Sequence, residues 1–160
     1  MSKLESADFA KMWNVYRKDT SSGDRSTINR ARSVEDLVLK SPALYRLLRK
    51  AGIDTEKVNI YQYARVVWFF PFAVQSDDCK NVGVMLKRVG GNRIRQMTVL
   101  NESATESLVI FRSILRVAKH KSQSKTLYID WNVLGECLFF WGETVRKRIR
   151  MQFLCAGGDK

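Results

Sequence analysis

The sequence predicts an all-α protein made of two packed helical bundles, an N-terminal and a C-terminal half, with no significant sheet. Apolar residues recur at steps of three and four along most of the 160 residues, as on the buried face of an amphipathic helix. Helix-start residues precede several of these stretches, of which Ser41-Pro42 is the strongest example. Only Met97–Val99 and Leu127–Ile129 have strand propensity, and both are too short to organise a sheet.

The first half, residues 1–90, contains an expected core built on aromatic helices. A first helix over 7–18 has Ser6 as its cap, and a loop follows over 19–24. Ser33 caps the turn before a short apolar stretch, and the helix from Pro42 ends at Gly52 in a left-handed cap. A longer helix starts at about Lys57, and Pro71 should kink or end it.

The second half, residues 91–160, follows the expected hinge at Gly90-Gly91. Short helices are predicted over 81–88 and 93–100, and a capping box at Ser103 starts a long helix that runs to about Lys119. A basic loop holds His120, and Asp130 then caps one closing helix over 130–150. Its apolar stripe consists of Trp131, Leu134, Leu138, Trp141, Val145 and Ile149.

The net charge of +12 is concentrated in two segments. Residues 25–50 have seven basic and two acidic side chains, a net charge of +5. Residues 111–151 have nine and three, a net charge of +6. Such clustering favours a polyanionic partner, and solvated helix faces are the plainer alternative. We expect no membrane-spanning segment and no secretory signal, and three dispersed cysteines predict a cytoplasmic protein with reduced thiols.

Signatures of an enzyme are missing, so we expect no catalytic residues, no metal and no cofactor. The single histidine has basic neighbours that make it a poor general base, and the cysteines lack zinc-ligand spacing. Asp77-Asp78 has no third acidic residue nearby to complete a divalent-ion site. Gly90-Gly91 is not followed by the lysine of a phosphate-binding loop.

Rows of cations are the candidate binding sites. Arg112, Arg116 and Lys119 fall on one side of a helix. Further groups, each rich in arginine, are Arg146, Lys147 and Arg150, and the looser set Arg30, Arg32, Arg46 and Arg49. Arginine's planar fork suits phosphate oxygens, so sequence-independent binding to the nucleic-acid backbone fits best. A DNA-reading helix-turn-helix would need polar base-edge readers among these arginines, and the helices are poor in them.

Five motifs in order over most of the chain resemble the CasB family, the small subunit of the type I-E CRISPR surveillance complex, Cascade. They are Gly23-Asp24-Arg25 with Ile28 to Ala31; Pro42 to Leu48 (PALYRLL); Arg93-Ile94 with Met97; Leu108 to Leu115; and Asp130-Trp131 with Phe140-Trp141-Gly142, Arg146 and Lys147. Asn29 stands where the family often has arginine, and the spacing from Pro71 to Gly90 matches least well.

The resemblance implies two helical bundles without catalytic activity, and a head-to-tail homodimer beside the other Cascade subunits. It implies that basic surfaces hold CRISPR RNA and target DNA and steady the displaced strand, while guide–target pairing reads the sequence. The matching family arginines are Arg25, Arg30, Arg46, Arg93, Arg112 and Arg146. Helical geometry adds Arg116, Lys119, Lys147 and Arg150. Arg25 and Arg46 have an alternative role, bracing the bundle by an internal ion pair.

A second function stays open from the residues alone. The basic faces could meet acidic surfaces of protein partners, in a basic all-α interaction or DNA-binding module without a CRISPR role. Phe139 and Phe140 lie off the main apolar stripe of the closing helix, so at least one of them is a candidate anchor for a partner or for the other half.

Overall fold

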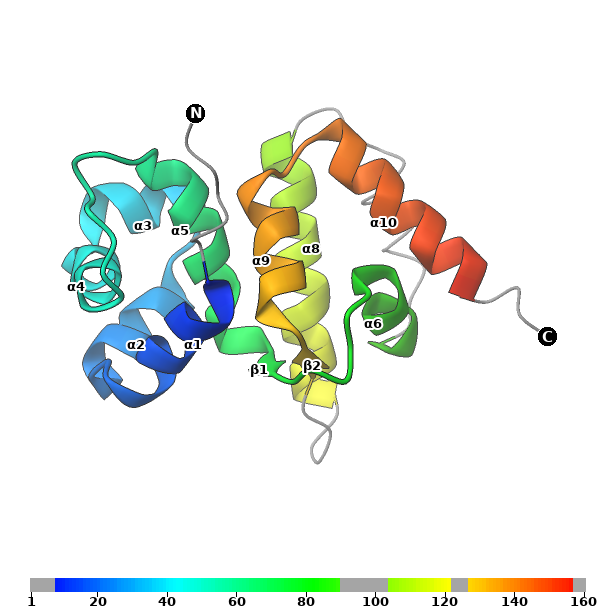
Figure 1. Cartoon of the computed structure of the whole chain (residues 1–160), viewed down its shortest axis with the longest axis horizontal. Helices are drawn as coiled ribbons and strands as arrows, with labels where there is room; N and C mark the ends of the chain where they lie inside the picture. The colour runs from blue at the N-terminus through cyan, green and yellow to red at the C-terminus, as the bar shows by residue number, and fades with distance from the viewer. Residues whose placement is uncertain (1–7, 90–103, 122–126, 157–160) are drawn as a thin grey trace. The chain divides into compact units, whose positions relative to one another are not determined.

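The structure, a computed structural model, describes residues 8–89, 104–121 and 127–156 (Figure 1). Its architecture is all-α, as predicted, and it divides into two compact units, Met1–Pro71 and Phe72–Lys160. The first unit contains α1 (Phe9–Lys18), α2 (Ser22–Arg30), α3 (Val34–Lys40), α4 (Pro42–Lys50) and α5 (Ile60–Phe69). The second contains β1 (Val74–Gln75), α6 (Val82–Val89), α8 (Ala104–Lys121), β2 (Tyr128–Ile129), α9 (Trp131–Phe139) and α10 (Glu143–Ala156).

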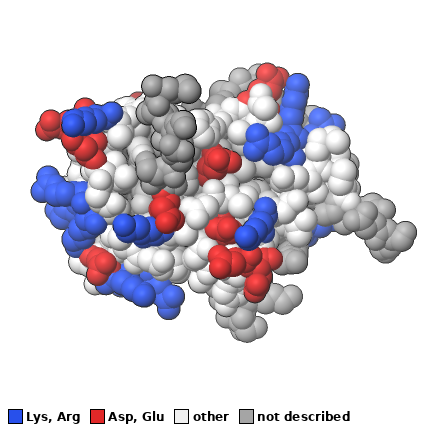
Figure 2. Space-filling view, in the orientation of Figure 1, with Lys and Arg blue, Asp and Glu red and all other residues white. Residues whose placement is uncertain are grey.

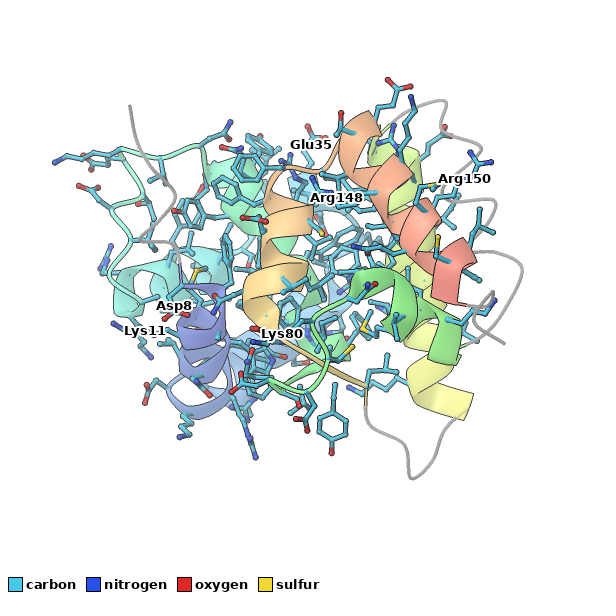
Figure 3. The ribbon with its side chains drawn as sticks, turned by 45° about the vertical axis from the view of Figure 1, so that its right-hand side comes forward. Asp8, Lys11, Glu35, Lys80, Arg148 and Arg150 are labelled. Carbon is cyan, nitrogen blue, oxygen red and sulfur yellow. The ribbon has the colours of Figure 1, made fainter. Side chains whose placement is uncertain are left out.

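Side-chain caps fix the starts of the first helices, with two differences from the sequence expectation. Asp8, not Ser6, caps α1, and its carboxylate accepts the backbone N–H of Lys11 (3.0 Å; both are labelled in Figure 3). The expected loop over 19–24 already contains the first turn of α2, because the Ser21 hydroxyl accepts the N–H of Asp24. The cap at Ser33 is confirmed for α3.

Helix α4 has the predicted proline start and glycine end, but the Ser41 side chain makes no capping hydrogen bond. Pro42 is the first residue of α4, and Gly52 after it has a φ of 85°, the left-handed conformation expected there. Asn59 caps α5, which starts at Ile60 rather than at about Lys57. Ahead of Pro71 the α-helix changes to a 3-10 turn, η2 (Phe70–Phe72), since proline cannot donate to the helical ladder.

Buried indoles tie the first unit together. The Trp68 indole N–H donates to the carbonyl of Ala31, the residue after α2, at 2.9 Å. The Trp13 indole of α1 donates to the carbonyl of Phe70 at 3.3 Å. Both tryptophans are buried, and each hydrogen bond lets a large apolar side chain enter the core without leaving its N–H unsatisfied.

A parallel pair of two-residue strands lies at the start of the second unit, which is consistent with the prediction of no significant sheet. Val74 pairs with Tyr128 and Gln75 with Ile129 in a two-stranded parallel sheet. The Trp131 indole N–H donates to the carbonyl of Ala73 (3.2 Å), next to this pairing. Because 50 or so residues separate the strands, no local pattern signals the contact.

The boundary between the units also differs from the expected one at residue 90. The division along the chain falls between Pro71 and Phe72, because the pairing of β1 with β2 and the packing of α6 on α10 place residues 72–89 in the second unit. Gly90-Gly91, the Arg93–Leu100 helix and the Ser103 capping box lie outside the described residues.

The expected single closing helix is two helices. The first, α9, keeps Asp130 as its predicted cap and ends at Phe139, and α10 starts at Glu143. Trp141 lies in the break, where its indole N–H donates to the Ser107 hydroxyl (3.1 Å) and its ring stacks on Phe111. These contacts of Trp141, together with the low helix propensity of Gly142, break the helix here, although the apolar spacing in the sequence continues through the break.

A glycine permits the close contact of α6 with α10, which lie side by side in Figure 1. A Cβ added at Gly83 would lie 2.3 Å from the Gln152 Cβ and 2.5 Å from the Phe153 backbone nitrogen. The Gly83 N–H donates to the Gln152 side-chain oxygen at 3.1 Å. The Lys87 ammonium lies 4.7 Å from the centre of the Phe153 ring. Backbone atoms cannot yield as a flexible side chain can, so this contact requires glycine.

The variant Gly83→Ala should therefore lose stability, by about 1–3 kcal/mol or more, because the added methyl group forces α10 away from α6. Chemical denaturation followed by circular dichroism measures this loss. Gly23→Ala is the matched control: the nearest atom to its new Cβ is 4.0 Å away, and alanine favours the helix there. Equal stability of Gly83→Ala and the wild-type protein would contradict the close packing of these helices.

Candidate nucleic-acid interface

The predicted cation row of α8 is present, and it gathers around one aromatic ring. The ring of Phe72 lies 4.8 Å from the guanidinium carbon of Arg112, 5.3 Å from that of Arg116 and 5.7 Å from the Lys119 ammonium. Spacings of four and three residues put the three side chains on one side of α8. We call these three cations with Phe72 the Phe72 cluster.

Exposure differs sharply within the Phe72 cluster. Arg112 is only 5% exposed and Phe72 4%, whereas Arg116 and Lys119 are exposed. An aromatic face attracts cations within about 6 Å of its centre, and the attraction strengthens where water is excluded. The buried ring and guanidinium thus form a base under two cations that face solvent.

Arg46 has the structural partner that the alternative reading allowed. Its Nε and Nη2 atoms donate to the two carboxylate oxygens of Asp24, at 2.8 and 2.6 Å, in a forked ion pair between α4 and α2. These hydrogen bonds lower the pKa of the Asp24 carboxyl below its ordinary 3.8, against a smaller opposing effect of burial. The arginine side chain is about half exposed, so its pairing is screened by solvent.

Two further cations of the first unit bind the carbonyl-rich end of α1. Arg25 donates to the backbone carbonyls of Arg17 (3.1 Å) and Thr20 (2.7 Å), and the Lys50 ammonium donates to the carbonyl of Asp19. Positive charge is favourable at this end of a helix, where the last carbonyls lack helical partners. The segment with a net charge of +5 therefore supplies intramolecular contacts as well as exposed cations such as Arg30.

The predicted row on the last helix is split by burial. Arg146, expected on the exposed side, is 5% exposed, and its Nε and Nη1 atoms have no hydrogen-bond partner among the described residues. The break before α10 sets the buried face at Val145, Arg146 and Ile149. Lys147 and Arg150 are exposed, as is Arg148 (Arg148 and Arg150 are labelled in Figure 3).

The predicted cations do not merge into one described cluster. Arg112, Arg116 and Lys119 are brought together, Arg46 and Arg25 have internal partners, and Arg93 lies outside the described residues. On the face drawn in Figure 2, acidic atoms lie between basic ones. Sequence reasoning did not identify the contact of Phe72 with these cations. No local signal links residues that are 40 positions apart.

The described residues include the histidine and the cysteines that were weighed for other chemistry. They contain no group of three metal-ligating side chains, and no described helix is long and apolar enough to cross a membrane. His120, expected in a loop, lies within α8. Burial raises the pKa of the Cys137 thiol to about 11, which disfavours the reactive thiolate at neutral pH.

The fold has a match among solved structures. A chain in the crystal structure of Escherichia coli Cascade bound to a PAM-containing double-stranded DNA target superposes with a TM-score of 0.76. The match covers 99% of this chain and 100% of that one at 20% sequence identity, and so shows a shared fold. No family model matches the sequence, and no curated protein does.

The forked ion pair of Asp24 with Arg46 predicts how the stability of the protein depends on pH. Its contribution is complete above the ordinary carboxyl pKa of 3.8 and is lost as the pH falls through the lower pKa of Asp24 in the folded protein. Asp24→Asn should thus be less stable than the wild type at neutral pH, and the difference should shrink well below pH 3.8. Urea midpoints at the two pH values measure this.

Asp54→Asn is the control for that comparison. Its pair with Lys57 is long (3.8 Å) and both side chains are exposed, so removing it should cost less at neutral pH. Equal neutral-pH midpoints for Asp24→Asn and the wild type would show that the forked pair contributes nothing to stability.

Proposed function

We propose that this chain is the non-catalytic small subunit of a type I-E CRISPR surveillance complex, Cascade. In this role it binds nucleic acid through basic helix faces without reading sequence. It holds CRISPR RNA, target DNA and the displaced strand in antiviral defence, next to the other subunits and as a homodimer within the complex. Guide–target pairing supplies the sequence specificity of such complexes, so this subunit needs only backbone contacts.

The observation that carries the proposal is the fold match over the full length of both chains. A general helical motif would match over part of the chain only, whereas here both halves match in order. The five sequence motifs, which are side-chain patterns, resemble a subunit of the same complex, and the match adds the likeness of the backbone. At 20% identity the two lines of support overlap little.

The charge distribution supports binding to the phosphate backbone of a nucleic acid. Arg116 and Lys119 are exposed and stand over a buried aromatic base, and Lys147, Arg148 and Arg150 are exposed on α10. Cations of this kind displace condensed counterions from a nucleic acid, which gives affinity that depends strongly on salt and weakly on sequence.

One observation favours the second candidate, a protein-interaction module. Phe139 is buried at 5% exposure, but Phe140 is 46% exposed at the break between α9 and α10. Met151 and Leu154 are also exposed on α10. Exposed apolar side chains of this size are typical anchors for protein partners. Subunit contacts and nucleic-acid contacts are compatible in one complex, so this surface fits either candidate.

Replacing Arg116 and Lys119 together with alanine should weaken binding of nucleic acid by about tenfold or more at low salt, since two charge-assisted phosphate contacts are lost. Fluorescence anisotropy measures this with labelled single-stranded DNA, double-stranded DNA and RNA of two unrelated sequences each, over a series of salt concentrations. Helicity should not change.

The matched control is Lys11→Ala with Lys18→Ala, which removes two exposed charges from α1. If the two double variants weaken binding equally, the net charge of the protein alone explains the affinity, and the α8 cations have no special role. The CRISPR role has its own test. When the tagged chain is expressed from its own gene cluster, it should co-purify with a guide RNA and the products of neighbouring CRISPR-associated genes. Recovery without either would leave the interaction module as the better assignment.

A further inference from the structure

We propose that the Phe72 cluster is a two-phosphate site in which Arg116 and Lys119 contact neighbouring phosphates of one strand. Arg112 and Phe72 are positioning residues and do not contact the ligand. The binding of phosphates by Arg116 and Lys119 rests on the proposed nucleic-acid function. The positioning role of Phe72 and Arg112 does not.

The division of roles follows from burial. A phosphate carried on a polymer can reach only side chains that face solvent, and Arg112 is 5% exposed. Arg116 and Lys119 are both exposed and lie three residues apart on α8. Both charged groups lie within 6 Å of the centre of one ring, so they are at most about 11 Å apart. Neighbouring phosphates of one strand fall within that range, so one strand can contact both cations.

The Phe72 ring orients the three cations. Three like charges on one side of a helix repel one another, and long side chains otherwise spread over many rotamers. The ring lies within 6 Å of all three cations and attracts each of them. The ring therefore favours one direction for the Arg116 and Lys119 side chains, and binding costs less ordering entropy.

The position of the ring is itself fixed by the backbone. The carbonyl of Ala73, the next residue, accepts the indole N–H of Trp131 at 3.2 Å. One residue further, the Val74 N–H donates to the Leu127 carbonyl at 2.8 Å. Phe72 therefore presents its ring from a rigid segment rather than from a loop tip, which is the arrangement a positioning residue needs.

An isosteric change separates the positioning role from simple core packing. Pentafluorophenylalanine keeps the shape of phenylalanine but reverses the charge distribution of the ring, so at position 72 it should remove the attraction to the cations. Affinity for single-stranded DNA should fall roughly fivefold, which corresponds to about 1 kcal/mol. The same substitution at Phe111, which stacks on Trp141, is the matched control and should leave affinity unchanged.

The salt dependence of binding counts the phosphate contacts. Arg116→Ala and Lys119→Ala should each lower the slope of log affinity against log salt by about 0.7 on single-stranded DNA. Arg112→Met and fluorinated Phe72 should weaken binding at an unchanged slope. A slope that falls as far for Arg112→Met as for Arg116→Ala would overturn the two-phosphate assignment. If Arg112→Met does not fold, the fluorinated protein and the two alanine variants still decide the matter.

A measurement without ligand keeps the two proposals distinguishable. Ring currents of Phe72 should displace the NMR signal of the Arg116 side-chain Nε–H, and Phe72→Leu should return it to the position of a solvated arginine. An unmoved signal overturns the positioning role, whatever the binding data show. A displaced signal together with no binding to any nucleic acid supports the positioning role and rejects the proposed function.

Discussion

The segment from Phe70 to Gln75 is the constraint on which most of the structure depends. Its backbone carbonyls accept the indole N–H groups of two tryptophans, Trp13 at Phe70 and Trp131 at Ala73. The Gln75 side-chain oxygen accepts the backbone N–H of Trp131 at 2.7 Å, at the start of α9. A buried donor without a partner costs as much as a lost hydrogen bond, so each of these contacts fixes the segment in place. Phe70 belongs to the first compact unit, and Phe72, Ala73 and Gln75 belong to the second.

Basic residues of the same type have different roles because their surroundings differ. In the first unit, Arg25 binds carbonyls at the end of α1, and Arg46 forms a fork with Asp24. In the second, Arg112 is buried beside an aromatic ring, while Arg116, one turn further, faces solvent. A net charge of +12 therefore overstates the surface available to a polyanion. A neighbouring carboxylate, carbonyl or ring gives several of these arginines a contact within the protein.

Sequence reasoning succeeded where the chemistry is local. The caps at Ser33 and Asp130, the proline start of α4 and the left-handed Gly52 all follow from residues within one turn of the helix end. The spacing of Arg112, Arg116 and Lys119 likewise predicted a row that the structure confirms. Sequence reasoning did not predict contacts between distant segments, such as the parallel pair of β1 with β2 and the contact of Phe72 with α8.

The sequence by itself determined an all-α chain, the ends of several helices and the identity of the cation row, because helix periodicity and capping act over three or four residues. The tertiary structure decided that the closing helix breaks at Trp141, because the indole of that residue is held by Ser107 of α8. It also decided that Arg146 is buried and that the α8 cations gather over Phe72. Burial and long-range contact are properties of the packed chain, and no window of sequence contains them.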